Sequence, residues 1–174
     1  HAVSGYSGGG KQMIAAYESR SAPDFELYGL GLAHKHVAEL QKYAGLTRRP
    51  IFVPSVGDFA QGMIDSIPLH LDLLRGRPSP AEIEAILAAR YAGSEVVRVV
   101  PAEAGGKLEP QALNGTNSIE LRVHGNAAHG HAVLTARYDN LGKGASGAAV
   151  QNLGLMLGIP VNADLPAATP QAAA

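Results

Sequence analysis

The chain has 174 residues, of which 46% are hydrophobic and 17% charged, and its formal net charge is -1. This length and balance fit one ordinary domain with a hydrophobic core, and they provide no clustered basic surface for nucleic acid or an anionic membrane. The sequence contains no cysteine, which excludes disulfides, thiolate metal sites and a cysteine nucleophile within these residues. No apolar run is long enough to cross a bilayer and the start has no signal-peptide pattern, so we expect a cytoplasmic protein.

The first half of the chain is predicted to alternate between helices and strands. A glycine-rich turn at residues 5–10 leads into residues 11–18, which favour a helix. Three further segments are predicted to be strands and one a helix: strands at residues 25–32, 51–54 and 63–71, and a helix at residues 36–43 that Gly45 can end. Pro68 predicts that the strand over 63–71 lies at an edge or contains a bulge.

The clearest local signal is a capping box at residues 79–82, Ser-Pro-Ala-Glu, with proline at the first helical position. It predicts a helix that ends near Gly93. We expect one face of this helix to be apolar and to consist of Ile83, Ile86, Leu87 and Tyr91.

The second half of the chain is predicted to be mostly strand, at residues 95–100, 118–124 and 132–138. Apolar and polar residues alternate from Ile119 to His124, which predicts one dry face and one face that is wet or covered by another chain. Such alternation indicates an antiparallel or mixed sheet. A last helix is predicted over residues 144–157, ended by Gly158.

Both ends of the chain are distinctive. It opens on His1 without a methionine and reads as the tail of a strand, so we expect an excised piece of a longer protein. Residues 159–174 are rich in alanine and proline and have no apolar periodicity, which predicts a disordered tail.

Two glycine-rich motifs have the spacing of nucleotide-binding loops but lack the residues that such loops need. Residues 5–11 have P-loop spacing, yet Gln12 stands where a magnesium-binding Ser or Thr is required. Residues 142–147 match G-x-G-x-x-G, yet no strand with a ribose-binding acid follows them. Each turn could still bring backbone amides close to an anion, and a tight structural turn is the alternative for the first.

Histidines occur in two pairs with one residue between them, His34 with His36 and His129 with His131. A zinc site needs three or four converging ligands, so we expect no metal site. His129 and His131 fall in a Gly/Ala-rich hairpin loop and are expected to be exposed. The first pair follows a predicted strand, where histidine can exchange protons near neutral pH, and a purely structural histidine is the alternative.

Four segments together resemble the N-acetyl-gamma-glutamyl-phosphate reductases, in their shorter branch. They are residues 4–11, 34–36, 114–117 and 139–152, and the last of them is the most specific. The resemblance implies an α+β fold: a mixed, largely antiparallel sheet with helices on one face, like the C-terminal domain of glyceraldehyde-3-phosphate and aspartate-semialdehyde dehydrogenases. It also implies a catalytic and dimerisation domain over residues 1–143 and a terminal helix over 144–158 that packs on a nucleotide-binding domain.

The resemblance implies a reaction in arginine biosynthesis. In these enzymes a cysteine thiolate attacks an acyl phosphate, NADPH delivers hydride to the thioester, and N-acetylglutamate semialdehyde and phosphate leave. The implied catalytic residues are His34 and His36, with His34 favoured as the acid/base. The implied substrate-binding residues are Ser4, Gly5, Ser7, Gly8 and Lys11. The residues implied to approach the NADP cofactor are Asn140, Lys143, Gly144, Ser146 and Gly147.

The family's nucleotide-binding domain and its nucleophilic cysteine precede the region that this chain matches. The resemblance therefore implies that this chain alone is inactive, that it works with that N-terminal domain, and that it forms a homodimer or homotetramer. Three alternatives stay open: a reductase for aspartyl or aminoadipate-type acyl phosphates, a non-catalytic binding or oligomerisation module, and an unrelated phosphate-binding protein.

Overall fold

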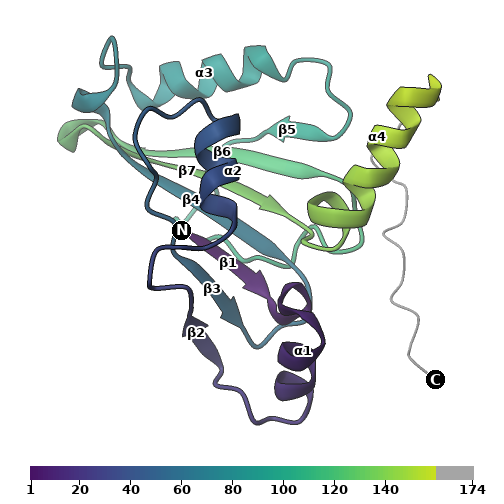
Figure 1. Cartoon of the computed structure of the whole chain (residues 1–174). Helices are drawn as coiled ribbons and strands as arrows, with labels where there is room; N and C mark the ends of the chain where they lie inside the picture. The colour runs from purple at the N-terminus through teal and green to yellow at the C-terminus, as the bar shows by residue number, and fades with distance from the viewer. Residues whose placement is uncertain (160–174) are drawn as a thin grey trace.

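The computed structural model describes residues 1–159, whose strands form one mixed seven-stranded sheet in the order β2-β3-β1-β4-β7-β6-β5 (Figure 1). Four of the six strand pairings are antiparallel, while β1 runs parallel to β3 and β5 parallel to β6. The α+β fold with a largely antiparallel sheet is therefore confirmed. The strands are β1 (Ala2–Gly5), β2 (Phe25–Leu27), β3 (Pro54–Gly57), β4 (Met63–His70), β5 (Val97–Val99), β6 (Ile119–Asn126) and β7 (His131–Tyr138).

Four α-helices connect or follow these strands: α1 (Gly10–Glu18), α2 (His36–Tyr43), α3 (Pro80–Arg90) and α4 (Gly147–Leu157). Short helical turns also occur, namely η1 (Tyr6–Gly9), η2 (Leu71–Leu73), η3 (Ala127–His129) and the π-helical turn η4 (Gly142–Ser146). The predicted capping box of α3 is confirmed, because Ser79 Oγ accepts from the backbone N–H of Glu82 and the Glu82 carboxylate accepts from that of Ser79.

Two predicted strands have different bounds in the structure. The extended segment predicted over residues 25–32 ends at Leu27, because the chain turns at Gly29 and Leu32, which both have positive φ. The strand predicted over residues 51–54 instead begins at Pro54, since β1 pairs with Pro54–Gly57 in register. Of the tail predicted at residues 159–174, the structure describes Ile159 alone. The prediction of a disordered tail therefore lies outside the described residues.

The predicted edge position of Pro68 is confirmed locally, although β4 lies inside the sheet. β1 pairs only with the first residues of β4, and the last contact on this side is the N–H of Ser66 bonded to the carbonyl of His1 at 2.8 Å. Because alternate backbone N–H groups of a strand point the same way, the nitrogen of Pro68 faces the side that β1 leaves uncovered.

The main core lies between α3 and one face of the sheet. Ile83 of α3 packs there with Leu71, Val123 and Ala132. Ile86 was predicted on the same apolar face but is 64% exposed. The face of α3 that the sheet covers is therefore narrower than the set of apolar residues in its sequence. α2 lies over the β4–β7 part of the same face, where it borders a cavity described below. The prediction of helices on one face is thus confirmed (Figure 1).

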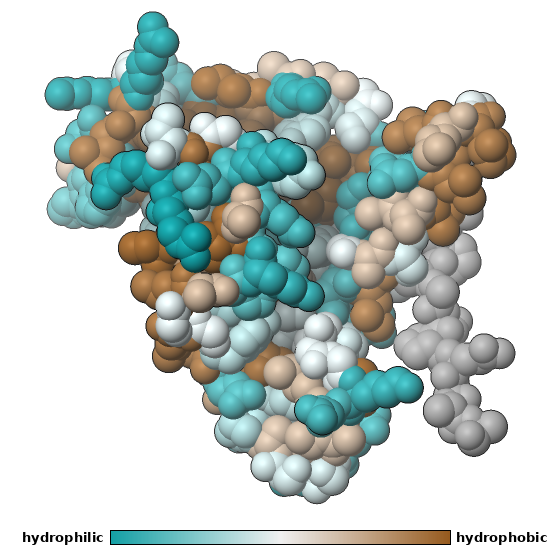
Figure 2. Space-filling view, viewed as in Figure 1, coloured by the Kyte–Doolittle hydropathy of each residue, from teal (hydrophilic) through white to brown (hydrophobic). Residues whose placement is uncertain are grey.

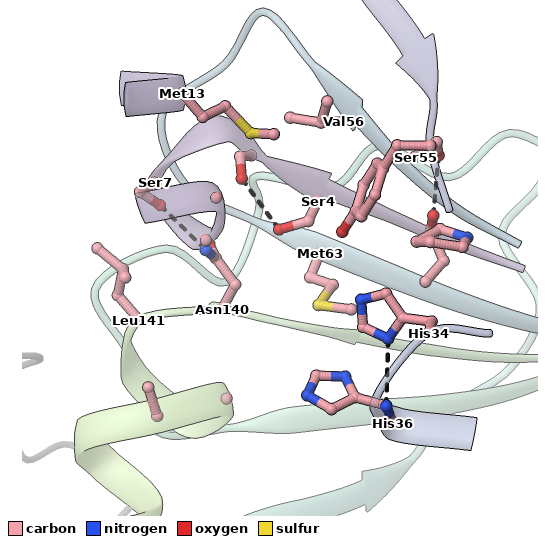
Figure 3. Close-up of a pocket in the computed structure, with 18 of the residues that line it drawn as sticks. Ser4, Ser7, Met13, His34, His36, Ser55, Val56, Met63, Asn140 and Leu141 are labelled. Carbon is pink, nitrogen blue, oxygen red and sulfur yellow. Dashed lines mark hydrogen bonds between the residues drawn. The ribbon is translucent and has the colours of Figure 1, made fainter. Parts of the chain in front are cut away.

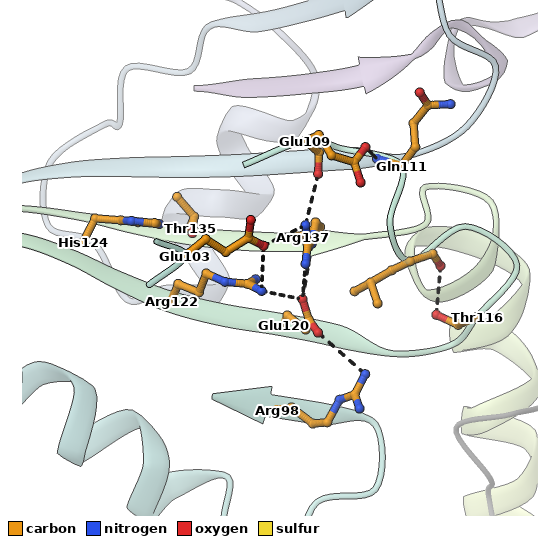
Figure 4. Close-up of polar contacts among 11 residues, drawn as sticks. Arg98, Glu103, Glu109, Gln111, Thr116, Glu120, Arg122, His124, Thr135 and Arg137 are labelled. Carbon is orange, nitrogen blue, oxygen red and sulfur yellow. Dashed lines mark hydrogen bonds and ion pairs between the residues drawn. The ribbon is translucent and has the colours of Figure 1, made fainter. Parts of the chain in front are cut away.

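The polar residues of β6 and β7 face the other side of the sheet, where the chain itself covers them (Figure 4). Glu120 is bonded to Arg137 and Arg122, at 2.7 Å and 2.9 Å. Glu103, from the segment between β5 and β6, reaches both arginines at 3.1–3.2 Å. The prediction that this face is wet or covered by another chain was wrong at these residues, because a segment of the same chain supplies the countercharge.

Helix α4 continues directly from η4 after the end of β7, and ends at Gly158 in the left-handed conformation (Figure 1). Figure 2 shows it as a hydrophobic region on this view of the surface. Its exposed apolar residues are Val150, Leu153, Leu155, Met156 and Leu157. No helix within residues 1–159 is long and apolar enough to cross a membrane.

Candidate functional site

A cavity of about 590 Å³, which we call cavity 1, lies where β1 and β3 meet the turns η1 and η4 and the loop before α2 (Figure 3). It brings together segments far apart in sequence. Eight of the residues predicted to form the site line it: Ser4, Gly5, Ser7, Gly8, His34, His36, Asn140 and Gly144. Four do not: Lys11, Lys143, Ser146 and Gly147.

The glycines of the first motif let β1 and η1 approach their neighbours closely. The N–H of Gly5 donates to the carbonyl of Gly62 at 2.9 Å, and a Cβ on Gly5 would lie 2.5 Å from the carbonyl oxygen of Ala60. A Cβ on Gly8 would lie 3.3 Å from Ser4 Oγ. The motif therefore first serves close packing of the backbone, and three of its glycines, Gly5, Gly8 and Gly9, line the cavity.

Asn140 joins the two sides of cavity 1. Its Oδ1 accepts from the N–H of Gly62 at 2.9 Å, and its Nδ2 donates to Ser7 Oγ at 3.0 Å. Because Ser7 Oγ accepts this bond, its own hydroxyl proton remains available to a ligand. Asn140 thus fixes the position of the Ser7 hydroxyl relative to the end of β7.

Asp139, to which no role was assigned from sequence, organises the loops behind this wall. Its carboxylate is completely buried and accepts from the N–H groups of Gly115 and Leu141 at 2.7 and 2.8 Å, and from the Gln61 side chain. These bonds fix the start of η4, which carries Gly144 into the cavity wall. The signal in the sequence was an acidic residue directly before Asn140 at the end of a predicted strand.

The two histidines of the second motif lie at the start of α2 and have different surroundings. His36 is the first residue of the helix, and His34 lies two residues before it. The His34 ring is half-buried against the rings of Tyr28, Phe52 and His36, with centroids 4.8–6.1 Å apart. Its Nδ1 accepts from the backbone N–H of His36 at 3.2 Å. Burial lowers the pKa of His34, and the charges of His36 and Lys35 lower it further. His34 is therefore neutral near pH 7 with its proton on Nε2, whereas His36 is exposed.

Cavity 1 is lined by basic side chains and by no acidic ones. Lys35, His34 and His36 line it, and none of its lining residues is Asp or Glu. Lys35 was not assigned a role from sequence, although its place between two candidate histidines was a signal. Other lining residues that sequence reasoning did not single out are Met13, Tyr28, Phe52, Ser55 and Met63.

The four predicted residues outside cavity 1 have other surroundings. Lys11 is exposed on α1. Lys143 donates to Gln151 Oε1, and burial lowers its pKa. Ser146 Oγ donates to the carbonyl of Leu141 at 2.8 Å, within the π-helical turn. Gly147 is buried where a Cβ would overlap the Asn117 side chain, so it serves helix packing.

A second cavity of about 490 Å³, cavity 2, lies between α2 and the sheet and shares His36 with cavity 1. Its floor contains Asp65 and Tyr138, whose hydroxyl donates to Asp65 Oδ2 at 2.7 Å. Burial raises the pKa of Asp65, although the bond from Tyr138 opposes this, and burial together with the Asp65 charge raises the pKa of Tyr138. Cavity 2 is thus acidic where cavity 1 is basic.

The histidines at the turn of the β6–β7 hairpin are separate from both cavities. His129 and His131 are exposed, as predicted, and the ring of His131 lies 4.9 Å from that of His70. Within residues 1–159 no group of three or more His, Cys, Asp or Glu side chains is placed to hold a metal ion.

Comparison with known proteins gives a family model and relatives that agree with one another. The family model of the semialdehyde dehydrogenase dimerisation domain matches residues 1–140. The chain is 52% identical over 164 residues to N-acetyl-gamma-glutamyl-phosphate reductase 2 of Pseudomonas putida, and 54% identical over 166 residues to the N-acetyl-gamma-glutamyl-phosphate reductase of Brucella ovis. Each match covers 91% of this chain but 52% and 54% of the relative, so the chain spans about half the length of these proteins.

A likeness to solved structures supports the fold. The aspartate semialdehyde dehydrogenase II of Vibrio cholerae superposes with a TM-score of 0.61 at 16% identity, over 90% of this chain and 53% of that one. The same enzyme in complex with ASA gives the same TM-score at 14% identity. At such identities the likeness concerns the fold alone.

Proposed function

Because the chain belongs to the semialdehyde dehydrogenase dimerisation-domain family, we propose that it is the substrate-binding and subunit-pairing half of an N-acetyl-gamma-glutamyl-phosphate reductase. The complete enzyme would reduce the acyl phosphate to N-acetylglutamate semialdehyde and release phosphate. The relatives at 52–54% identity support this substrate over an aspartyl phosphate. The observation that carries the proposal is cavity 1, where Ser7, His34 and Asn140 converge from distant segments beside Lys35.

The geometry of cavity 1 supplies an acid/base group and polar anchors. His34 is neutral near pH 7 and keeps a proton on Nε2, so it can donate to an oxygen that gains negative charge during reduction. His36 stands beside it and contributes to the lowered pKa of His34. The Ser7 hydroxyl, positioned by Asn140, can donate to the substrate.

We assign the reactive end of NADP, which supplies the hydride when it is bound, to the part of cavity 1 that Gly8 and Gly144 line. Gly8 and Gly144 keep this part of the wall free of side chains, and a Cβ at these positions would be in tight contact, 3.3 Å from Ser4 Oγ and 3.1 Å from the Tyr138 ring. Such a wall can accept a planar ring, and the Asn140 amide borders it. We assign the remainder of the cofactor to residues outside this chain.

The proposal also requires groups that these 174 residues do not contain. The acyl-transfer step needs a thiolate, and the sequence has no cysteine, so the nucleophile has to come from elsewhere in the complete enzyme. We further propose that the complete enzyme is cytoplasmic and a homodimer or homotetramer. The match to a dimerisation-domain model supports this assembly.

A chimera tests the proposed function. The chain would be fused in register in place of the matching half of the Pseudomonas putida relative, and phosphate-dependent reduction of NADP by N-acetylglutamate semialdehyde would be measured. We expect turnover by the chimera and none by the 174-residue chain alone, because the proposal assigns the thiolate to the half that only the chimera would contain. Turnover by the pure chain, or a folded chimera that reduces aspartyl phosphate better, would contradict the proposal.

A further inference from the structure

We propose that Lys35 is the cation that binds the phosphoryl group of the substrate in cavity 1. The inference rests on the proposed function, and it names the residue that binds the phosphoryl group of that substrate. The resemblance implied Lys11 as a substrate-binding residue, and the structure places it outside the lining of cavity 1.

The charge of cavity 1 selects an anion. Its lining contains one lysine, two histidines and several hydroxyl and amide groups, and no Asp or Glu. An acyl phosphate carries its negative charge on the phosphoryl oxygens, which are strong hydrogen-bond acceptors. Cavity 2, which contains Glu39 and Asp65 and no lysine or arginine, would repel the same group.

Position separates Lys35 from the other lysines of the sequence motifs. Lys11 lies on α1, outside the lining of cavity 1; both Lys11 and Lys35 are exposed, so they differ in position and not in burial. Lys143 is engaged with Gln151 and also lies outside that lining. Lys35 lines the cavity and has no hydrogen bond or ion pair with any residue of the described range 1–159, so its ammonium is available to a ligand.

Lys35 is a sequence neighbour of His34, the acid/base group of the proposed function. It lies between His34 and His36, immediately before α2, and its charge is one cause of the lowered pKa of His34. A phosphoryl group bound by Lys35 would therefore lie next to the imidazole that donates a proton. Lysine suits this task because its ammonium is a compact charge on a flexible stem.

The test uses the 174-residue chain and inorganic phosphate, which is the leaving group of the proposed reaction. Phosphate affinity would be measured by calorimetry at constant ionic strength for the wild type, Lys35→Gln, Lys11→Gln and Lys42→Gln. Lys42 is a matched control, because it lies on α2, the helix that follows Lys35, but outside cavity 1. Lys35→Arg keeps the charge and tests rescue.

We expect Lys35→Gln to weaken phosphate binding about tenfold or more, the effect of losing one charged hydrogen bond. Lys35→Arg should keep most of the affinity, and Lys11→Gln and Lys42→Gln should change it less than twofold. Thermal unfolding of each variant would show that the fold is intact, which the absence of any side-chain cap from Lys35 on α2 leads us to expect.

Three results would overturn the inference: no phosphate binding by the wild type, equal weakening by all three glutamine variants, or weakening by Lys11→Gln alone. None of them bears on turnover by the chimera. Conversely, a chimera without turnover would contradict the proposed function while the role of Lys35 in anion binding could still be shown.

Discussion

Glu120 is the residue on which the covered polar face of the sheet depends. Its carboxylate is bonded to Arg122 and Arg137, whose side chains are only 6% and 8% exposed. Two arginines held so far from water need their countercharges, because a buried charge without a partner is costly. The sequence showed the alternation of charges on β6, but not that Glu103 would fold back over them.

The variant Glu120→Gln should therefore lower the free energy of unfolding by about 3 kcal/mol at pH 7, as for a broken buried pair. Burial alone would raise the pKa of Glu120, but hydrogen bonds from Arg137 and Arg122 outweigh it and lower that pKa. The wild type should thus keep its advantage above the ordinary pKa of a glutamate and lose it as the pH falls through the lowered one.

Denaturant unfolding over a range of pH measures this difference. Glu95→Gln is the matched control, since Glu95 is exposed and forms no ion pair within residues 1–159. If both variants were equally stable at pH 7, the covered face would not need its countercharge and this account of the network would be wrong.

At the scale of elements, features that depend on neighbouring residues in the sequence were predicted better than features that depend on contacts between elements. The capping box of α3 was complete in the sequence because Ser79 and Glu82 act on each other's backbone. The bounds of β3 depend instead on its register with β1, and the exposure of Ile86 depends on how much of α3 the sheet can cover. Neither partner is local, so neither could be predicted from periodicity.

Gly147 shows the same limit at the start of α4. The sequence placed it in a glycine motif beside the cofactor, whereas the structure packs it against Asn117. Propensity alone predicts that Gly147→Ala stabilises a helix by about 1 kcal/mol. A Cβ here would lie only 1.6 Å from Asn117 Oδ1, so we expect the opposite sign, a loss of about 2 kcal/mol.

Thermal and denaturant unfolding of Gly147→Ala decide the sign. Gly31→Ala serves as control, because a Cβ there would meet no atom within 4 Å. A stabilised Gly147→Ala variant would show that α4 is free to shift at its first turn.

At the scale of the whole molecule, eight of twelve predicted site residues meet in cavity 1, and the roles assigned to them remain proposals. Motifs on the loops of β1, α2 and β7 could be placed together from the resemblance, because a shared fold carries the relative positions of its loops. Which lysine lies at the cavity was not predictable from the motifs, and the structure places Lys35 in its lining and Lys11 outside it. We propose that a further part of the complete enzyme covers the exposed apolar residues of α4.

The most direct test of the central claim, that cavity 1 is the catalytic site, is the turnover number of the chimera with His34→Gln compared with His129→Gln. His129 is exposed at the far hairpin and outside cavity 1, so it controls for the loss of a histidine. The account predicts that His34→Gln lowers kcat about a hundredfold or more, as for a lost acid/base group, while His129→Gln leaves it within about twofold. Equal effects of the two changes would contradict it.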